Sequence, residues 1–423
     1  MGEPEMKKIR MGVIGLGKRG YSVMKDVILG FDDVDVVALC DVYEDRVEHG
    51  NEAVKEVKGH DAEIRTTDYR EVLNKDKVDA VYIATAWETH IVISIAAMHA
   101  GIPVAMEVGG ACDLRECNDL VTAYEETGTP IMLMENCCFG ADELMATAMA
   151  RDGVFGEVVH CHGAYAHDLR EEITHGNVKR HYRLRHYSRR NCENYPTHEL
   201  GPIAKLLNIN RGNRLVSLTS VASKAAGIKA YLEKHNYEMD ESLRGVEFAQ
   251  GDIVSTTIKC AGGQTITLSL DTTLPRFYSR EFTVRGTEGF YEAGTGTVFI
   301  DGMEEGFETV EMYKKYLGNN EQYKEDYMPD IWMNITEEQK IKGHGGIDYF
   351  EFKAFFECLK ENKPMPIDVY DAATWMCITC LSEASVAMGG QPMAIPDFTN
   401  GAWVGRKPED VMPLGKKSKL AAK

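Results

Sequence analysis

Apolar and polar positions follow two different patterns along this chain. Through the first third, short runs of consecutive apolar residues alternate with longer stretches of helical character. The apolar runs lie at Ile9–Ile14, Val34–Cys40, Val78–Ala84, Pro103–Val108 and Ile131–Met134, and the helical stretches at Tyr21–Leu29, Tyr43–Val57, Thr89–Ala100 and Leu114–Thr127. Apolar strands separated by helices are typical of a parallel sheet covered on both faces. We therefore predict a doubly wound, parallel α/β domain over residues 1–140.

From residue 141 onward the pattern changes. After a predicted helix at Ala141–Arg151, strands with alternating apolar residues lie at Val158–His162, Arg214–Val221, Ile253–Cys260, Gln264–Asp271, Glu281–Arg285 and Thr297–Ile300. The pair Gly262-Gly263 lies between two of them as a hairpin signal. Alternation is typical of antiparallel sheets with one covered face. We expect an α+β domain with an open, mostly antiparallel sheet over residues 141–423, from which late helices at Tyr349–Leu359 and Ala372–Ala387 could return to the first domain.

The run Gly15-Leu16-Gly17-Lys18-Arg19-Gly20 joins the first predicted strand to the first predicted helix. In this pattern the first glycine allows a tight turn, the second lets a pyrophosphate approach the backbone, and the third lets helix and strand pack closely. Asp41 ends the second apolar run, where an acid accepts hydrogen bonds from an adenosine ribose. The pattern predicts a Rossmann domain that binds NAD, while Arg19 beside the turn leaves the choice of NAD over NADP open.

Composition and charge narrow the classes of partner. The 423 residues are 44% hydrophobic and 27% charged, with a net charge of −19. So acidic a chain argues against nucleic acid and anionic membranes, and no apolar run is long enough to cross a bilayer. The first residues lack an apolar core and the eleven cysteines are scattered, so we expect a cytoplasmic protein with reduced thiols. The open sheet is a candidate surface for a homo-oligomer, a dimer or larger.

Polar residues follow three predicted strands of the parallel sheet. The stretch Ala84-Thr85-Ala86-Trp87-Glu88-Thr89-His90 ends one strand, and Glu107-Val108-Gly109-Gly110 and Glu135-Asn136-Cys137-Cys138 end the next two. Ligands of doubly wound folds bind at this carboxyl edge. Trp87 is therefore either packed in the core or a wall of the nicotinamide site, and Asn136 could donate to a ribose or a carboxamide.

A histidine-rich stretch, His160-Cys161-His162-Gly163-Ala164-Tyr165-Ala166-His167, begins the second half. Alternation along a strand places His160 and His162 on one face, and Tyr165 and His167 on one face beyond a bend at Gly163. Three histidines and a cysteine invite a zinc site, but no second cluster completes a ligand set. We expect no metal, and a polar cleft lined by Tyr165 and His167.

A second cluster, from Arg183 to His198, lies at about the middle of the chain. Arg183 begins a basic stretch that is either a solvated face or a group that orients substrate oxygens. In Asn194-Tyr195-Pro196-Thr197-His198 we expect a helix capped by Thr197 or Asn194, with Tyr195 and His198 near its N-terminus. A histidine there is biased toward the neutral form and toward proton transfer.

Taken together, these motifs resemble the oxidoreductase superfamily of glucose–fructose oxidoreductase and inositol dehydrogenase. Most dehydrogenases of that superfamily carry Glu-Lys-Pro where this chain has Glu107-Val108-Gly109. The chain is more similar to the NAD-dependent α-N-acetylgalactosaminidases, glycoside hydrolase family 109, over residues 10 to 350. The motifs that carry this likeness are Trp87-Glu88-x-His90, Glu107-Val108, Glu135-Asn136-Cys137-Cys138, Tyr165-x-His167-Asp168-Leu169-Arg170, Asn194-Tyr195-Pro196-Thr197-His198 and Gly343-His344-Gly345-Gly346-x-Asp348.

The resemblance implies an NAD-dependent glycoside hydrolysis of an α-N-acetylgalactosaminide, an exception to the two-carboxylate mechanism. It implies tightly bound NAD that oxidises C3, loss of the C2 proton, elimination at C1, water addition and re-reduction, so that the cofactor is regenerated in each cycle. The implied cofactor contacts are Gly15, Gly17, Lys18, Arg19, Gly20, Asp41, Thr85, Trp87, His90, Glu107, Val108 and Asn136. The implied sugar contacts are Tyr165, Arg183, Tyr195, Pro196, Thr197, His198 and Tyr278, with catalysis assigned to His198 and Tyr195, and then to His167 and Tyr165.

Two other functions remain open from the sequence alone. One is a net NAD(P)-dependent sugar or polyol dehydrogenase on the same fold, against which the missing lysine counts. The other is an NAD-binding scaffold without catalysis. The family usually has glycine after Tyr-Pro-Thr-His, whereas Glu199 follows here, so the substrate could be a different glycoside.

Overall fold

The computed structural model describes residues 8–235, 240–303 and 310–415. Its contacts divide the chain into two compact units. The first unit comprises Met1–Asn136 and Ile335–Ala373, and the second comprises Cys137–Asn334 and Thr374–Lys423. Among the described residues, no helix is both long and apolar enough to cross a membrane.

The first unit is built on a six-stranded sheet with the order β3-β2-β1-β4-β5-β6. Every strand pair in it is parallel, as expected for strands separated by helices. The strands are β1 (Ile9–Ile14), β2 (Val34–Cys40), β3 (Ile64–Thr66), β4 (Ala80–Ile83), β5 (Val104–Glu107) and β6 (Ile131–Met134). The predicted parallel α/β fold is confirmed. The sequence reading missed β3, because this short edge strand is only half-buried and has no apolar run.

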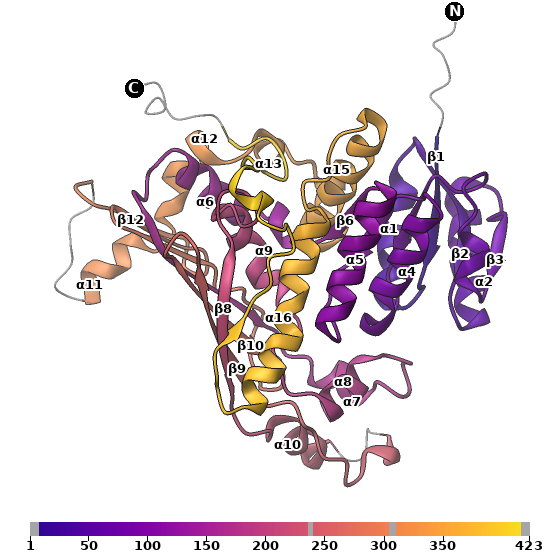
Figure 1. Cartoon of the computed structure of the whole chain (residues 1–423), viewed down its shortest axis with the longest axis horizontal. Helices are drawn as coiled ribbons and strands as arrows, with labels where there is room; N and C mark the ends of the chain where they lie inside the picture. Colours follow the sequence, from indigo (N-terminus) through magenta and orange to yellow (C-terminus); the bar gives the residue numbers. More distant parts are fainter. Residues whose placement is uncertain (1–7, 236–239, 304–309, 416–423) are drawn as a thin grey trace, which may run out of the picture. The chain divides into compact units, whose positions relative to one another are not determined.

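Five helices of the first unit fill intervals between its strands (Figure 1). They are α1 (Lys18–Asp26), α2 (Glu44–Lys58), α3 (Tyr69–Val72), α4 (Trp87–His99) and α5 (Leu114–Thr127). Two more helices of this unit, α14 (Glu337–Lys340) and α15 (Ile347–Glu361), come late in the chain. Local signals set their ends. For example, the Asp113 side chain accepts the backbone N–H of Glu116 at the start of α5, and Gly128 ends that helix with a φ of 62°.

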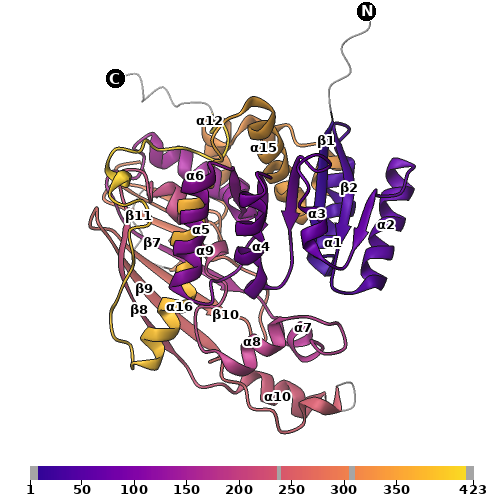
Figure 2. The same cartoon turned by 45° about the vertical axis from the view of Figure 1, so that its right-hand side comes forward.

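The second unit is built on an eight-stranded sheet with the order β13-β12-β11-β7-β10-β9-β8-β14 (Figure 2). Only the β7–β10 pair is parallel among the described strands of this sheet. The strands are β7 (Val158–Ala166), β8 (Leu215–Ala222), β9 (Ile253–Cys260), β10 (Thr265–Asp271), β11 (Thr283–Gly286), β12 (Gly289–Glu292), β13 (Thr297–Ile300) and β14 (Met393–Ala394). The expected open, mostly antiparallel sheet is confirmed, and β9 and β10 form the hairpin expected around Gly262-Gly263.

Strand β7 differs from the expectation because it runs through Gly163 without ending there. A Cβ atom at Gly163 would lie 2.9 Å from both the Cβ and the carbonyl oxygen of Glu199 in α9 (Thr197–Leu206). The glycine therefore allows helix α9 to approach the strand closely, and it does not mark a bend. Tyr165 accordingly belongs to the same regular strand as His160 and His162.

The remaining helices of the second unit are α6 (Ala141–Arg151), α7 (Arg170–Thr174), α8 (Arg183–Arg189), α10 (Gly227–Lys234), α11 (Val310–Tyr313), α12 (Lys324–Tyr327) and α13 (Asp330–Met333). Helix α16 (Val369–Ala387) has its first residues in the first unit and the rest in the second. It contains a C-x-x-C spacing, Cys377 to Cys380, that the sequence reading missed. Each of these thiols donates to a backbone carbonyl three residues earlier, as in an ordinary buried helix.

Candidate functional site

Two of the three glycines between β1 and α1 are required by the packing of the protein backbone, whether or not a ligand is bound. Gly15 has a φ of 97°, and a Cβ atom on it would lie 2.5 Å from the carbonyl group of Ala84. A Cβ atom on Gly20 would lie 1.9 Å from the carbonyl oxygen of Gly15. Any side chain at these positions would collide with backbone, so both glycines close the turn.

Gly17 is a different case, and it tests whether the site fits a dinucleotide. It precedes α1 with an ordinary φ of −65° and no side-chain cap, and a Cβ atom on it would meet nothing closer than Arg46 Nη1 at 3.6 Å. The protein alone would therefore accept a side chain here. Glycine at this position leaves the backbone open at a helix N-terminus, which is the arrangement that accepts a pyrophosphate.

Asp41, at the end of β2, stabilises the glycine turn through hydrogen bonds. Its carboxylate accepts the backbone N–H of Leu16 at 2.7 Å and that of Tyr43 at 3.0 Å. A carboxylate has about four acceptor positions, so two are left for the hydroxyl groups of a ribose. The sequence reading missed Arg46, whose guanidinium lies over the Tyr43 ring, 4.8 Å from its centre, and 3.6 Å from Asp41 Oδ2.

We expect Asp41→Ala to weaken NAD binding by about 10- to 100-fold, because a charged hydrogen bond contributes about 1.5–3 kcal/mol. Isothermal titration calorimetry with NAD measures the affinity, and circular dichroism checks the fold, since Leu16 also loses its acceptor. The control is Glu56→Ala, which removes an exposed acid from α2. An unchanged affinity in Asp41→Ala would exclude the ribose assignment.

Thr85, Trp87 and His90 lie together where β4 meets α4. The Nε2 atom of His90 contacts the carbonyl oxygen of Thr85 at 3.0 Å, and its buried Nδ1 atom has no partner among the described residues. Burial lowers the pKa of His90, so the ring is neutral and Nδ1 is available to a ligand.

Trp87 is 3% exposed and packs directly on Gly109, where a Cβ atom would lie 2.5 Å from the indole Cδ1. The close approach of the indole thus requires glycine at position 109. Val108, beside it, is also buried. Packing therefore accounts for the burial of Trp87, and a role as a wall of the nicotinamide site stays a prediction.

Arg19, Glu107 and Asn136 belong to one hydrogen-bonded network centred on Asp348. Glu107 Oε1 accepts from Arg19 Nε and from the Tyr82 hydroxyl, each at 2.7 Å. Asp348 accepts from Arg19 Nη1 at 2.7 Å and from Asn136 Nδ2 at 2.6 Å. Although burial alone would raise it, Arg19 and His344 hold the pKa of Asp348 well below its usual range, so the carboxylate stays charged. Three expected cofactor contacts are thus held in place by one another.

The loop before Asp348 has an unusual backbone. All four residues Gly343, His344, Gly345 and Gly346 have positive φ, and His344 at 41° is the one with a side chain. This turn brings His344 Nδ1 to 2.8 Å from Asp348 Oδ2. A polar hollow of about 210 Å³ lies beside it, lined by Arg19, Ser22, Val23, Asp26, Val27, Gly343, His344 and Asp348.

In the second unit the fold gathers the predicted aromatic and imidazole side chains into one cluster. The Tyr165 ring lies 4.7 Å from that of Tyr195 and 5.4 Å from that of His198, and Tyr195 and His198 are 4.8 Å apart. The Tyr165 hydroxyl lies 3.2 Å from His167 Nδ1, and the His167 ring lies 5.2 Å from that of Tyr278. Three separate segments of sequence therefore supply these five side chains.

Arg183, from α8, completes the cluster and is buried rather than solvated. Its guanidinium lies over the Tyr195 ring at 4.8 Å, and its Nε is 2.9 Å from Glu172 Oε1. Glu172 was not predicted, because a single charged residue on a short helix gives no signal in the sequence. The cluster has an inner side of Tyr165, Tyr195 and Arg183, while Tyr278 is 46% exposed and the two histidines are half-buried.

Burial sets the protonation of this cluster. It raises the pKa of Tyr165, although Arg183 partly opposes the effect, so the phenol keeps its proton. Burial and Arg183 both lower the pKa of His167, which is neutral at pH 7. A protonated phenol next to a neutral imidazole is a pair that can pass a proton.

Two of the expected sugar contacts lie deeper than the others. Pro196 and Thr197 are buried, and Thr197 is completely so. The expected cap is wrong, because Pro196 precedes α9 without any side-chain cap and Thr197 is its first residue. Asn194 instead donates to Gln250 Oε1 at 3.1 Å. The backbone here is fixed by the ring of Pro196.

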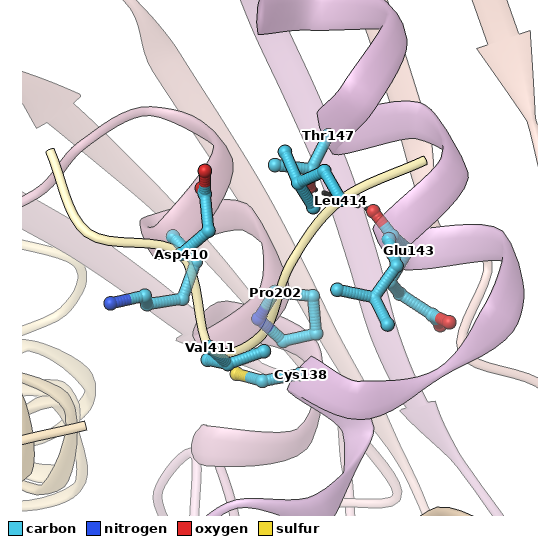
Figure 3. Close-up of a pocket in the computed structure, with 9 residues that line it drawn as sticks. Cys138, Glu143, Thr147, Pro202, Asp410, Val411 and Leu414 are labelled. Atoms are coloured by element: carbon cyan, nitrogen blue, oxygen red, sulfur yellow. Dashed lines mark hydrogen bonds between the residues drawn. The ribbon is translucent and has the colours of Figure 1, made fainter. Parts of the chain in front are cut away.

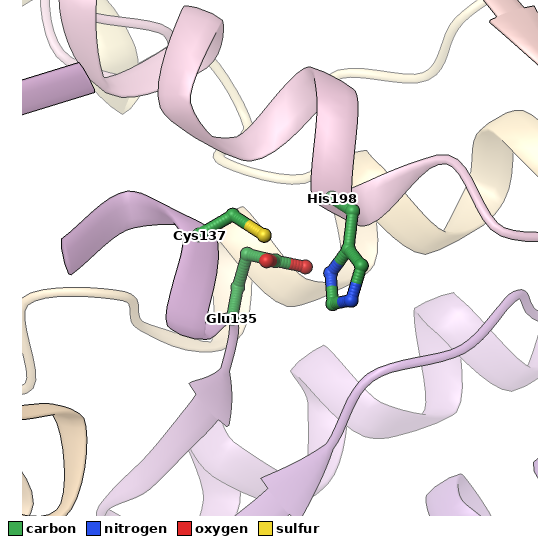
Figure 4. A group of neighbouring side chains, drawn as sticks. All are labelled: Glu135, Cys137 and His198. Carbon is green, nitrogen blue, oxygen red and sulfur yellow. The ribbon is translucent and has the colours of Figure 1, made fainter. Parts of the chain in front are cut away.

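His198 has a thiol as a neighbour. A ring nitrogen of His198 and the Sγ of Cys137 lie within 4.8 Å of each other (Figure 4). A structural zinc ion takes four ligands, and this thiol and imidazole are only two. We assign no metal to this pair.

A small hollow in the second unit lies between α6 and α9 (Figure 3). Its volume is about 10 Å³, and Cys138, Glu143, Pro202 and Val411 are among its lining residues. This space holds about one water molecule and no sugar. The aromatic cluster is therefore the better candidate for a glycoside.

Both units match families of known proteins. Residues 139–405 match the model described as glycosyl hydrolase 109, C-terminal domain, and residues 9–135 match the oxidoreductase family with an NAD-binding Rossmann fold. The chain is 38% identical to a glycosyl hydrolase family 109 protein of Stenotrophomonas maltophilia, over 95% of this chain and 91% of that protein. It is 36% identical to an alpha-N-acetylgalactosaminidase of Tannerella forsythia, over 95% and 88% of the two chains.

Solved structures show the same fold at low sequence identity. An inositol dehydrogenase homolog from Azotobacter vinelandii, complexed with NADH and myo-inositol, has a TM-score of 0.62 at 17% identity. The match covers 92% of this chain and 98% of that one. The chain therefore belongs to glycosyl hydrolase family 109 and is a glycosidase with an NAD-binding Rossmann domain.

Proposed function

We propose that this glycosidase hydrolyses α-N-acetylgalactosaminides through the aromatic cluster of its second unit. The observation that carries the proposal is the contact of Tyr165, His167, Tyr195 and His198 within one cluster, because two phenols and two imidazoles can move protons without a pair of carboxylates. The Tannerella forsythia relative bears the name of this activity.

The first unit fits the cofactor through residues that leave room for it. The open backbone at Gly17 would receive the pyrophosphate, Asp41 the ribose, and the Nδ1 atom of His90 a polar group of the nicotinamide half. When bound, NAD supplies a reversible hydride acceptor for C3 of the sugar. We infer that the cofactor remains bound through the cycle, so that no net oxidation results.

The residues of the second unit would remove the proton from C2 of the sugar and later return one. We assign its removal to His198, with Tyr195 beside it, because both border the cluster at the start of α9. His167 and Tyr165 form the second donor–acceptor pair. Arg183 would orient the sugar oxygens from the inner side, and Tyr278 would cover the sugar from the exposed side.

The test is to incubate the purified protein with p-nitrophenyl α-N-acetylgalactosaminide and to follow nitrophenol and NADH absorbance together. The proposal predicts continued nitrophenol release without accumulation of NADH. Accumulation of NADH with free sugars, and no cleavage, would instead indicate a net dehydrogenase. Absence of both signals with this substrate, together with cleavage of another glycoside, would overturn the substrate and retain the chemistry.

A further inference from the structure

Tyr278 lies in a loop whose backbone is fixed on strand β7. The backbone N–H of Ser279 donates to the carbonyl oxygen of Ala166 at 2.9 Å, and the N–H of Ala166 donates to that of Ser279 at 3.1 Å. The N–H of Ala164 donates to the carbonyl oxygen of Arg280 at 2.6 Å. These bonds hold the chain immediately after Tyr278, so the side chain of Arg280 is not needed to keep the loop on the strand.

The Arg280 side chain instead joins a buried acid. Its Nε and Nη2 atoms lie 2.7 Å and 2.6 Å from Oε1 of Glu143, a residue in the first turn of α6. Glu143 is 3% exposed, and its carboxylate fits because residue 140 is glycine: a Cβ atom on Gly140 would lie 2.0 Å from Glu143 Oε2. The acid therefore fixes two of the three guanidinium nitrogens and leaves Nη1 for another contact.

The remaining nitrogen, Nη1, donates to the hydroxyl oxygen of Tyr278 in a long hydrogen bond of 3.5 Å. Arginine carries five donors and no acceptor, so this contact can run in one direction only. The proton of the Tyr278 hydroxyl has no acceptor among the described residues. Burial raises the pKa of Tyr278, so the phenol keeps this proton at pH 7.

We propose that Glu143 and Arg280 form a positioning pair that sets the Tyr278 hydroxyl as a hydrogen-bond donor to an oxygen atom of the sugar. Tyr278 is 46% exposed and its ring lies 5.2 Å from that of His167, so it borders the aromatic cluster. The pair acts through Tyr278 and takes no part in the chemical step. This inference deepens the proposed function and rests on it for the identity of the sugar.

The benefit of the pair is that the hydroxyl is oriented before a sugar binds. A phenol O–H rotates to suit its partners, and a donor on the oxygen from Arg280 favours the direction that points away from the guanidinium. Hydroxyl and N-acetyl carbonyl oxygens of a sugar can both accept from such a donor. A group that is ordered in advance loses less freedom on binding, so the affinity for the sugar should rise.

The experiment measures KM and kcat for p-nitrophenyl α-N-acetylgalactosaminide in Tyr278→Phe, Arg280→Met and the variant that combines both changes. Each single change should raise KM by about 3- to 10-fold, the usual effect of one hydrogen bond, while kcat stays within about twofold. The combined variant should have the KM of either single variant, because Arg280 acts only through the Tyr278 hydroxyl. The matched control is Arg285→Met, an exposed arginine of β11 whose guanidinium lies over the Phe290 ring, and its KM should be unchanged.

Arg280→Met by itself leaves the Glu143 carboxylate buried without a counter-charge. A second variant, Glu143→Gln/Arg280→Met, removes both charges together and should fold more stably. It should show the same rise in KM, with a melting temperature closer to that of the wild type. A rise in KM that multiplies with that of Tyr278→Phe would overturn the positioning role, and so would a wild-type KM in both Arg280 variants.

Binding of N-acetylgalactosamine, measured by isothermal titration calorimetry, separates this inference from the proposed function. The affinity ratios between the variants and the wild type should match the KM ratios. A wild type that binds the sugar with these ratios but cleaves no glycoside would overturn the proposed function alone. A wild type that does not bind the sugar would overturn both.

Discussion

Replacing His198 by alanine is expected to lower kcat for p-nitrophenyl α-N-acetylgalactosaminide by about 100- to 10,000-fold, the range over which a positioned acid or base accelerates a reaction. His198 is half-buried at the start of α9, with its ring 4.8 Å from that of Tyr195 and 5.4 Å from that of Tyr165. Its loss removes an imidazole from the cluster, and the phenol of Tyr165, which burial keeps protonated, cannot act as the base in its place.

The binding of NAD should be unchanged in His198→Ala, because His198 belongs to the second unit and the predicted cofactor contacts belong to the first. Calorimetric titration with NAD measures this directly. The matched control is His160→Ala. His160 lies on the same strand as Tyr165, but its Nδ1 atom contacts the hydroxyl of Thr265. If His198→Ala retains turnover, the role of the base would be assigned to His167 instead. Loss of NAD binding in this variant would indicate a structural role for His198.

Replacing Arg19 by methionine is expected to lower the free energy of unfolding of the first unit by about 3 kcal/mol. This is the lower end of the cost of removing one partner from a buried ion pair, because the Arg19 side chain is itself 29% exposed. Arg19 holds two carboxylates, Glu107 at 2.7 Å and Asp348 at 2.7 Å, which are 4% and 1% exposed. Without it, both carboxylates remain buried without their counter-charge, and the pKa of Asp348, which Arg19 holds down, should rise. Urea denaturation followed by circular dichroism measures the change.

Arg10→Met provides the matched control for Arg19→Met. Arg10 pairs with Asp79 at 2.8 Å, and its side chain is 31% exposed, close to the 29% of Arg19. Its partner Asp79 is 29% exposed, whereas the partners of Arg19 are buried, so this change should cost about 0–1 kcal/mol. Equal losses in the two variants would contradict the view that Arg19 neutralises buried charge. A stable Arg19→Met variant that binds NAD poorly would show that Arg19 serves the cofactor more than the fold.

The sequence pattern was sufficient for the architecture of both units. Five strands of the first sheet were predicted because they are runs of mainly apolar residues, and α5 was predicted from its helical pattern. The short strands β3, β12 and β14 were not predicted, because a strand of two to four residues shows little periodicity. Gly163 was read as a bend, since only the packing of α9 on β7 reveals why glycine is needed there.

The candidate residues were found from local motifs, but their relations were not. The Tyr165 and His167 pair follows from strand alternation, and Tyr195 and His198 are neighbours in sequence. For Arg183 the sequence left two interpretations open, a solvated surface residue or a substrate contact. In the structure its side chain is buried and lies over the Tyr195 ring. Glu172 and Arg46 were missed, because a single charged residue in a helix carries no pattern.

What the sequence determined by itself is therefore the class of each domain, the glycine turn and the chemical types of the candidate site. These depend on periodicity and on motifs of a few residues, which short-range sterics and hydrophobic burial translate into structure. Only the tertiary structure decided that Arg19, Glu107, Asn136 and Asp348 form one network. Such contacts join residues that are apart along the chain, and their charges interact strongly only because folding removes them from water.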